Sequence, residues 1–71
     1  MTLKEWERHE RKIVNGGVAY FYDDVRREFL YAYRQGRKFL LQTEEDNYTL
    51  KASFNLKDIG QYLTSTNRRR Y

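Results

Sequence analysis

The side chains that most often perform catalysis or hold metals are sparse in this chain of 71 residues. Its one histidine, His9, lies between Glu5 and Glu10 in a segment expected to be helical, and cysteine is absent. A zinc site takes several ligands, mostly Cys and His. A single histidine does not make such a site, so we predict no bound metal and no cofactor. We interpret His9 as a solvated or half-buried helix residue.

Carboxylates occur in two clusters that could in principle act as acid and base pairs. Asp23 and Asp24 form the first cluster, and residues 44–46 form the second. Both clusters fall in predicted turns, where solvated acids end strands and discourage pairing between sheet edges. Gly16 and Gly17 are too short a run for a dinucleotide-binding loop. No Ser/His/Asp set can be assembled either, so we predict that the chain is not an enzyme.

Tyrosine and the basic residues are the abundant groups with binding chemistry. The chain has seven Tyr, four Phe and one Trp, and fourteen Lys and Arg against ten Asp and Glu give a net charge of +4. A domain of this size buries only about 60% of the surface that its unfolded chain exposes, so some aromatic rings must stay accessible. Accessible rings beside arginine are typical of binding surfaces. Adjacent basic residues, such as Arg26 and Arg27, favour polyanionic partners.

Two helices are expected at the ends of the chain. Thr2 and Glu5 have the spacing of a capping box, and residues 2–14 are predicted to form an amphipathic helix that ends at Asn15 and the two glycines. Asn55 is predicted to cap a short second helix, whose apolar residues recur at helical spacing. These apolar residues are Leu56, Ile59 and Leu63.

Strands are expected between the helices, because the composition of residues 17–54 shifts to aromatic and β-forming residues with turn signals at short intervals. The predicted strands are 18–22, 27–34, 37–43 and 48–54. The fold class is therefore α+β, with an antiparallel three- to four-stranded meander between two helices. Residues 1–64 are predicted to form this single domain and 65–71 a flexible basic tail.

Residues 24–35 also fit a helical face, which leaves an alternative open. Val25, Phe29, Ala32 and Tyr33 have helical spacing, with Gly36 available as a terminator. A helix there would give a winged-helix-like arrangement. The density of Tyr and Phe favours the strand.

In the strand interpretation, alternate side chains point to opposite faces of the sheet. One face is then rich in tyrosine. The other is expected to pack under the helices through Ala19, Phe21, Leu30, Ala32 and Leu40. A competing interpretation buries the tyrosines under the helices with only their hydroxyls wet.

An exposed tyrosine face bordered by basic residues would suit a nucleic acid, with its nucleobases stacked on the rings and its phosphates held by Arg and Lys. We therefore expect a small basic nucleic-acid-binding accessory or regulatory protein, with a phage or mobile element as the candidate source. The residues predicted to bind DNA or RNA are Tyr20, Tyr22, Arg26, Arg27, Tyr31, Tyr33, Arg34, Arg37, Lys38, Arg68, Arg69 and Arg70.

The alternative function is a protein-interaction module, a small inhibitor or adaptor that uses the same Tyr- and Arg-rich surface. The sequence is compatible with a monomer or a homodimer. No apolar run is long enough to span a bilayer, and the charged residues 4–8 are unlike a signal peptide, so no membrane partner is expected. The absence of cysteine favours a cytoplasmic location.

Overall fold

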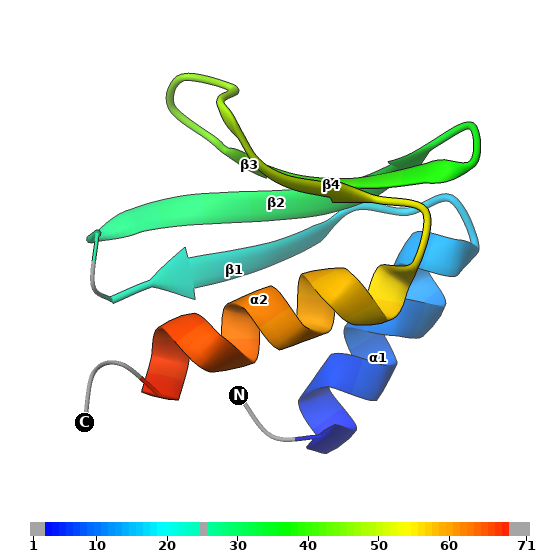
Figure 1. Cartoon of the computed structure of the whole chain (residues 1–71), viewed down its shortest axis with the longest axis horizontal. Helices are drawn as coiled ribbons and strands as arrows, with labels where there is room; N and C mark the ends of the chain where they lie inside the picture. The colour runs from blue at the N-terminus through cyan, green and yellow to red at the C-terminus, as the bar shows by residue number, and fades with distance from the viewer. Residues whose placement is uncertain (1–2, 25, 69–71) are drawn as a thin grey trace.

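Two helices pack on one face of a four-stranded antiparallel sheet (Figure 1). This computed structural model describes residues 3–24 and 26–68, with side chains for 4–24 and 26–63. The elements, in chain order, are α1 (Leu3–Val14), β1 (Ala19–Asp23), β2 (Glu28–Gln35), β3 (Lys38–Thr43), β4 (Thr49–Ser53) and α2 (Leu56–Arg68). The strands lie in the order β1-β2-β3-β4, so the predicted α+β meander between two helices is confirmed.

The segment that could have been a helix is strand β2, so the winged-helix alternative is wrong. Its residues alternate between the two faces, with Leu30 and Ala32 buried and the aromatic residues between them more exposed. This two-residue period places Leu30 and Ala32 in one row under the helices, whereas a helix would have put Phe29, Ala32 and Tyr33 on its apolar face. Gly36 follows at φ 63°, a left-handed conformation suited to glycine, and turns the chain into β3.

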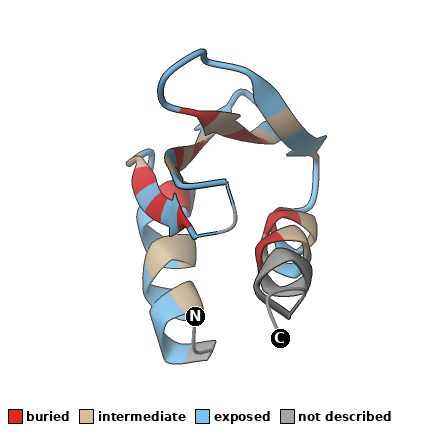
Figure 2. Ribbon diagram, turned by 90° about the vertical axis from the view of Figure 1, so that its left-hand side faces the viewer, coloured by how far each residue is buried: buried red, intermediate tan, exposed pale blue. Residues whose placement is uncertain are grey.

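The core lies between the sheet and the helices (Figure 2). α1 contacts β1 and β2, while α2 contacts β3 and β4. The expected apolar residues of α2 are all buried, and Trp6 of α1 packs at the edge of the core. The buried cluster consists of Ile13, Ala19, Phe21, Leu30, Ala32, Leu41, Leu56, Ile59 and Leu63.

Strand register decides which side chains share a face, because directly paired residues of antiparallel strands point the same way. Ala32 pairs with Ala19 on one side and Leu41 on the other, and all three are buried under the helices. Leu40 pairs with Tyr33 instead, so it lies on the opposite face. The prediction that Leu40 faces the helices was therefore wrong by one residue, and Leu41 takes that place.

Helix α2 begins as expected and runs further than expected. The side chain of Asn55 accepts a hydrogen bond from the Lys57 backbone amide at 3.0 Å, which confirms the cap. The helix continues to Arg68, beyond the predicted boundary between residues 64 and 65. Thr2 of the expected capping box, and residues 69–71, lie outside the described part of the chain. No helix in that described part is both long and apolar enough to cross a membrane.

Candidate functional site

Five aromatic rings project from the sheet on the side away from the helices. We call this surface, formed by Tyr20, Tyr22, Phe29, Tyr31 and Tyr33, the tyrosine face. The register pairs Tyr20 with Tyr31 and Tyr22 with Phe29, so rings of β1 and β2 lie side by side. Tyr20, Tyr22 and Phe29 are 59%, 50% and 55% exposed, while Tyr31 and Tyr33 are half-buried. The competing interpretation, which buried these rings under the helices, is wrong.

The rings of the tyrosine face fall into two groups. Tyr31 and Tyr33 are nearly parallel with centroids 5.8 Å apart, and Tyr20 lies 6.3 Å from Tyr31. Tyr22 and Phe29 form a separate edge-to-face pair at 4.9 Å, nearer the other end of β2. Such contacts hold rings in defined orientations while their outer surfaces stay accessible.

Tyr31 is fixed by hydrogen bonds as well as by its neighbours. Its hydroxyl donates to Gln42 Oε1 at 2.6 Å and lies 2.8 Å from the side-chain amide of Asn47. Gln42 in turn donates to Thr49 Oγ1 at 3.0 Å, so the network spans β2, β3 and β4. A ring held in this way loses little conformational entropy when a ligand contacts it. Gln42 and Thr49 were not predicted as site residues, because only the register of β2 with β3 places Gln42 beside Tyr31.

The β2–β3 turn brings positive charge to one end of the tyrosine face. Residues 34–38 contain three basic residues and no acidic residue. We call this turn the basic end. Lys38 pairs with Gln35, on the tyrosine-face side, and its Nζ lies 5.5 Å from the ring centroid of Phe54. Phe54 is 69% exposed and extends the aromatic surface beyond β4, which the sequence prediction did not include. Arg37 is exposed in the turn itself.

Arg34 belongs to the same end but to the other face of the sheet. It pairs with Phe39, whose ring packs against the core beneath the helices. Arg34 therefore follows the row of Leu30 and Ala32 and not the row of tyrosines. It can contribute to the electrostatic potential at the basic end, but it is not placed to flank the rings.

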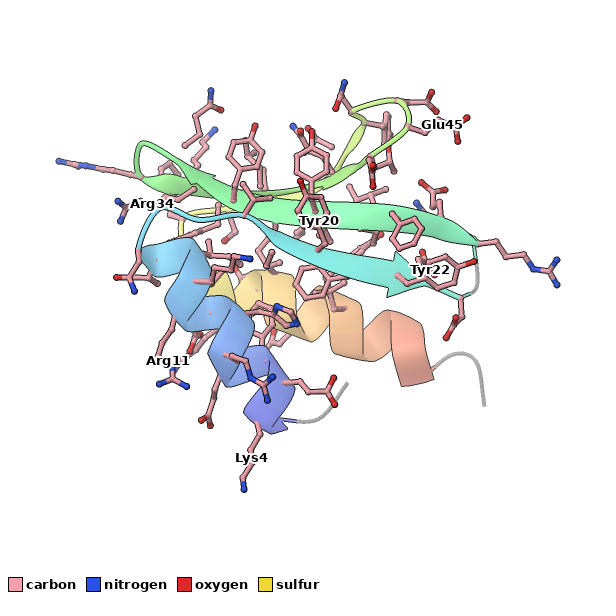
Figure 3. The ribbon with its side chains drawn as sticks, turned by 180° about the vertical axis from the view of Figure 1, so that it is seen from behind. Lys4, Arg11, Tyr20, Tyr22, Arg34 and Glu45 are labelled. Carbon is pink, nitrogen blue, oxygen red and sulfur yellow. The ribbon has the colours of Figure 1, made fainter. Side chains whose placement is uncertain are left out.

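The opposite end of the face is acidic, which the sequence prediction did not foresee. Figure 3 shows Glu45 and Tyr22 toward this end and Arg34 toward the other. The Glu44 amide donates to the Phe29 carbonyl at 3.0 Å, which joins the β3–β4 loop to the start of β2. We call this the acidic end. Its carboxylates are Glu44, Glu45 and Asp46 in the β3–β4 loop and Asp24 in the β1–β2 turn; Asp23 and Glu28 are at the same end but follow the row of Leu30 on the helix side.

Two predicted binding residues, Arg26 and Arg27, lie among these carboxylates. Arg26 Nε is 3.8 Å from the Asp23 carboxylate, and its backbone amide donates to the same group at 3.2 Å. Arg27 adopts φ 55° in the turn and lines a shallow hollow with Glu28, Phe29, Glu44 and Glu45. Nearby acids therefore offset both charges, so the structure separates them from the basic end.

The remaining predicted residues are at the chain end. Arg68 is the last residue of α2, and its side chain lies outside the described residues, as do Arg69 and Arg70. The structure thus places Tyr33, Arg37 and Lys38 toward the basic end of the face, with Tyr31 and its partner Tyr20 near the middle of β2. As binding residues they stay predictions.

His9 lies on the helix side and packs on the Phe21 ring, with centroids 4.7 Å apart. Its pKa is lowered from the usual value, mainly because burial disfavours the charged form. Arg8 and Lys12 lower it further, and Glu5 opposes them. No group of three or more His, Asp and Glu side chains that could hold a metal occurs within the described ranges.

Comparisons with known proteins add no relative to this picture, since no family model, curated protein or solved structure gives a significant match. The tyrosine face and its charged ends are therefore the features from which a function can be proposed.

Proposed function

We propose that this protein binds nucleic acid, as a small accessory or regulatory protein, through the tyrosine face and the basic end. The observation that carries the proposal is the arrangement of rings. Tyr20, Tyr31 and Tyr33 share the sheet face that the helices leave uncovered, and Lys38 lies on that same face. Rings offer a stacking surface to any base, and Arg37 and Lys38 offer contacts to phosphates.

The magnitudes decide which part of the surface matters most. Stacking on an aromatic side chain contributes roughly 1–3 kcal/mol per base, so the three tyrosines carry most of the expected affinity. Each phosphate contact adds a salt dependence of about 0.7 to 0.9 in the slope of log K against log salt. Two contacts, at Arg37 and Lys38, therefore predict a slope of about 1.4 to 1.8 in magnitude.

Fluorescence anisotropy with labelled DNA and RNA oligonucleotides tests the proposal. Tyr20→Ala is expected to weaken binding, because it removes an exposed ring whose hydroxyl makes no hydrogen bond to the described side chains. Tyr48→Ala is the matched control, since Tyr48 is also exposed but lies in the β3–β4 loop at the acidic end. Equal loss from both variants, or no binding to any DNA or RNA, would contradict the proposal.

A second pair of variants separates local contacts from overall charge. Lys38→Gln and Lys4→Gln change the net charge equally, but Lys4 is exposed on α1, away from the sheet (Figure 3). Loss of affinity and a shallower salt slope for Lys38→Gln alone support contact at the basic end. The same effect from both variants indicates a diffuse attraction to the whole molecule.

The alternative is a protein-interaction module that uses the same face. Apolar surface favours it, since Phe29 and Phe54 lack a polar group yet are among the most exposed rings. Cross-linking the chain to its bound partner, followed by nuclease digestion, distinguishes the two functions. Recovery of a cross-linked protein without nucleic acid supports the protein-interaction module. A cytoplasmic location, as predicted from the sequence, suits either function.

A further inference from the structure

The spacing of the three tyrosines allows the kind of nucleic acid to be inferred, if the proposed function holds. Tyr33, Tyr31 and Tyr20 form a connected row, which we call the ring track. Its centroids are 5.8 Å apart between Tyr33 and Tyr31 and 6.3 Å apart between Tyr31 and Tyr20. The Tyr33 end is nearest to the basic end, because Tyr33 is two residues before Gln35, the partner of Lys38.

The ring spacing exceeds the rise between bases in a duplex. Successive nucleotides of a B-form strand advance about 3.4 Å along the helix axis. A strand that places consecutive bases on rings 5.8 and 6.3 Å apart must be stretched to almost twice that rise. Its bases must also leave their own stack to reach the rings. A base-paired helix resists both changes, whereas an extended single strand does not.

The shape of the face leads to the same conclusion. Duplex recognition uses an element that enters a groove, usually a helix or a two-stranded ribbon. Both helices lie on the far side of the sheet (Figures 1 and 3). The tyrosine face is instead a sheet surface with upright rings, which is the arrangement that proteins use for splayed, unpaired bases.

Charge defines where the strand can lie. Phosphates are attracted to Arg37 and Lys38, beside the start of the ring track. Beyond Tyr22 and Phe29 the surface is dominated by the carboxylates of the acidic end, whose repulsion opposes a polyanion. The two ends are separated by β2, whose first and last residues are roughly 24 Å apart, since its eight residues make about seven steps of about 3.4 Å. The favourable part of the face thus runs from the basic end to the middle of β2, where Tyr31 and Tyr20 end the ring track.

We propose that the ring track and the basic end bind a short single-stranded polynucleotide, one base to each of Tyr33, Tyr31 and Tyr20, with its phosphates at Arg37 and Lys38. The bound polynucleotide starts at the β2–β3 turn and crosses from β2 to β1 before it reaches the acidic end. Duplexes of the same sequence lack free base faces and are not ligands of this site.

The test compares single strands with the matching duplex, and strands of increasing length. Labelled oligothymidylate and oligouridylate, from two to ten nucleotides, are titrated with the full chain, alongside an oligothymidylate annealed to its complement. Single strands are expected to bind at least tenfold more tightly than the duplex. Affinity is expected to rise steeply up to three or four nucleotides and little thereafter. The DNA and RNA arms show whether the sugar matters.

Variants of the ring track provide the structural control. Tyr20→Ala is expected to weaken single-strand binding about 5- to 150-fold, the equivalent of one lost stacking contact. Tyr48→Ala, in the β3–β4 loop at the acidic end, is expected to change it less than twofold. Circular dichroism of both variants verifies that the sheet is intact.

The outcomes separate this inference from the proposed function. Duplex binding as tight as single-strand binding overturns the single-strand inference and leaves the proposed function standing. Affinity that grows steadily to ten nucleotides overturns the limited track. Absence of binding to every oligonucleotide overturns both proposals.

Discussion

Gly60→Ala tests the account of how the two helices meet behind the sheet. Glycine in a helix interior costs roughly 1 kcal/mol relative to alanine, so helix propensity alone predicts that this change stabilises the protein. The structure predicts the opposite. A Cβ at residue 60 would lie 2.7 Å from Cε2, 2.9 Å from Cζ2 and 3.0 Å from Nε1 of Trp6.

The clash decides the sign of the effect. Trp6 packs against the core and its ring centroid lies 6.3 Å from that of Phe21, so the indole cannot move without losing contacts. Forcing an extra methyl group into a packed site costs typically 1–3 kcal/mol. Subtracting about 1 kcal/mol for the gain in helix propensity leaves a net destabilisation of about 0 to 2 kcal/mol. For a domain of this size, each 1 kcal/mol lowers Tm by roughly 4–8 °C.

Urea and thermal unfolding, followed by circular dichroism and by the fluorescence of Trp6, measure this effect. Trp6 is the only tryptophan, so its emission reports directly on the contact with α2. The matched control is Gln61→Ala, the next residue, which is exposed and gains no clash. A Gly60→Ala protein more stable than the original chain, with unchanged Trp6 emission, would refute the close packing of Trp6 on α2.

Three further predictions concern the cap, the histidine and the acidic end. Asn55→Ala is expected to destabilise the fold by about 1 kcal/mol in urea unfolding, because it removes the acceptor of the Lys57 amide; an effect below about 0.3 kcal/mol would show that the cap is not needed. Since the pKa of His9 is lowered in the folded state, the unfolded state binds more protons, and stability should fall as pH decreases through and below about 6.5. That step should disappear in His9→Gln, and persistence of the full step in this variant would assign it to another group. The double variant Glu44→Gln/Glu45→Gln is expected to tighten binding of a ten-nucleotide single-stranded oligonucleotide by a few-fold. The affinity for a three-nucleotide oligonucleotide is expected to stay unchanged. Equal gains in affinity for both lengths would contradict a bound oligonucleotide that stops short of the acidic end.

The sequence was sufficient to predict the tyrosine face, but not that one end of this face is basic and the other acidic. Tyr20 and Tyr22, and then Phe29, Tyr31 and Tyr33, recur every second residue, and this period alone assigns them to one side of each strand. Only the register shows that the two sets share a face, through the pairing of Tyr20 with Tyr31. Period and register together therefore define the surface.

Elsewhere the sequence signal was ambiguous or absent. Phe39, Leu40 and Leu41 are consecutive apolar residues, so no alternation distinguishes the helix side from the open side. Leu40 is buried as expected, but it was assigned to the helix side, where Leu41 lies. Gly60 was predicted only to weaken its helix, because nothing in the sequence shows that Trp6 lies against it.

The charge distribution also required the fold. The acids of residues 23–24 and 44–46 are about twenty positions apart in the chain, and the meander brings them to the same end of the sheet. Arg34 is close to Tyr33 in sequence, yet alternation directs it to the opposite face. Basic residues that neighbour tyrosines in the sequence were therefore wrongly expected to flank them in space. The separation of the face into a basic and an acidic end was not predicted.

The most direct test of the central claim is a titration of the isotope-labelled chain with a short single-stranded oligonucleotide, followed by amide and aromatic NMR shifts. The account predicts that the largest changes fall on Tyr20, Tyr31, Tyr33 and Lys38, with the helices α1 and α2 unaffected. Changes concentrated on the helix side, or no changes at millimolar oligonucleotide, would contradict the claim that the tyrosine face binds nucleic acid.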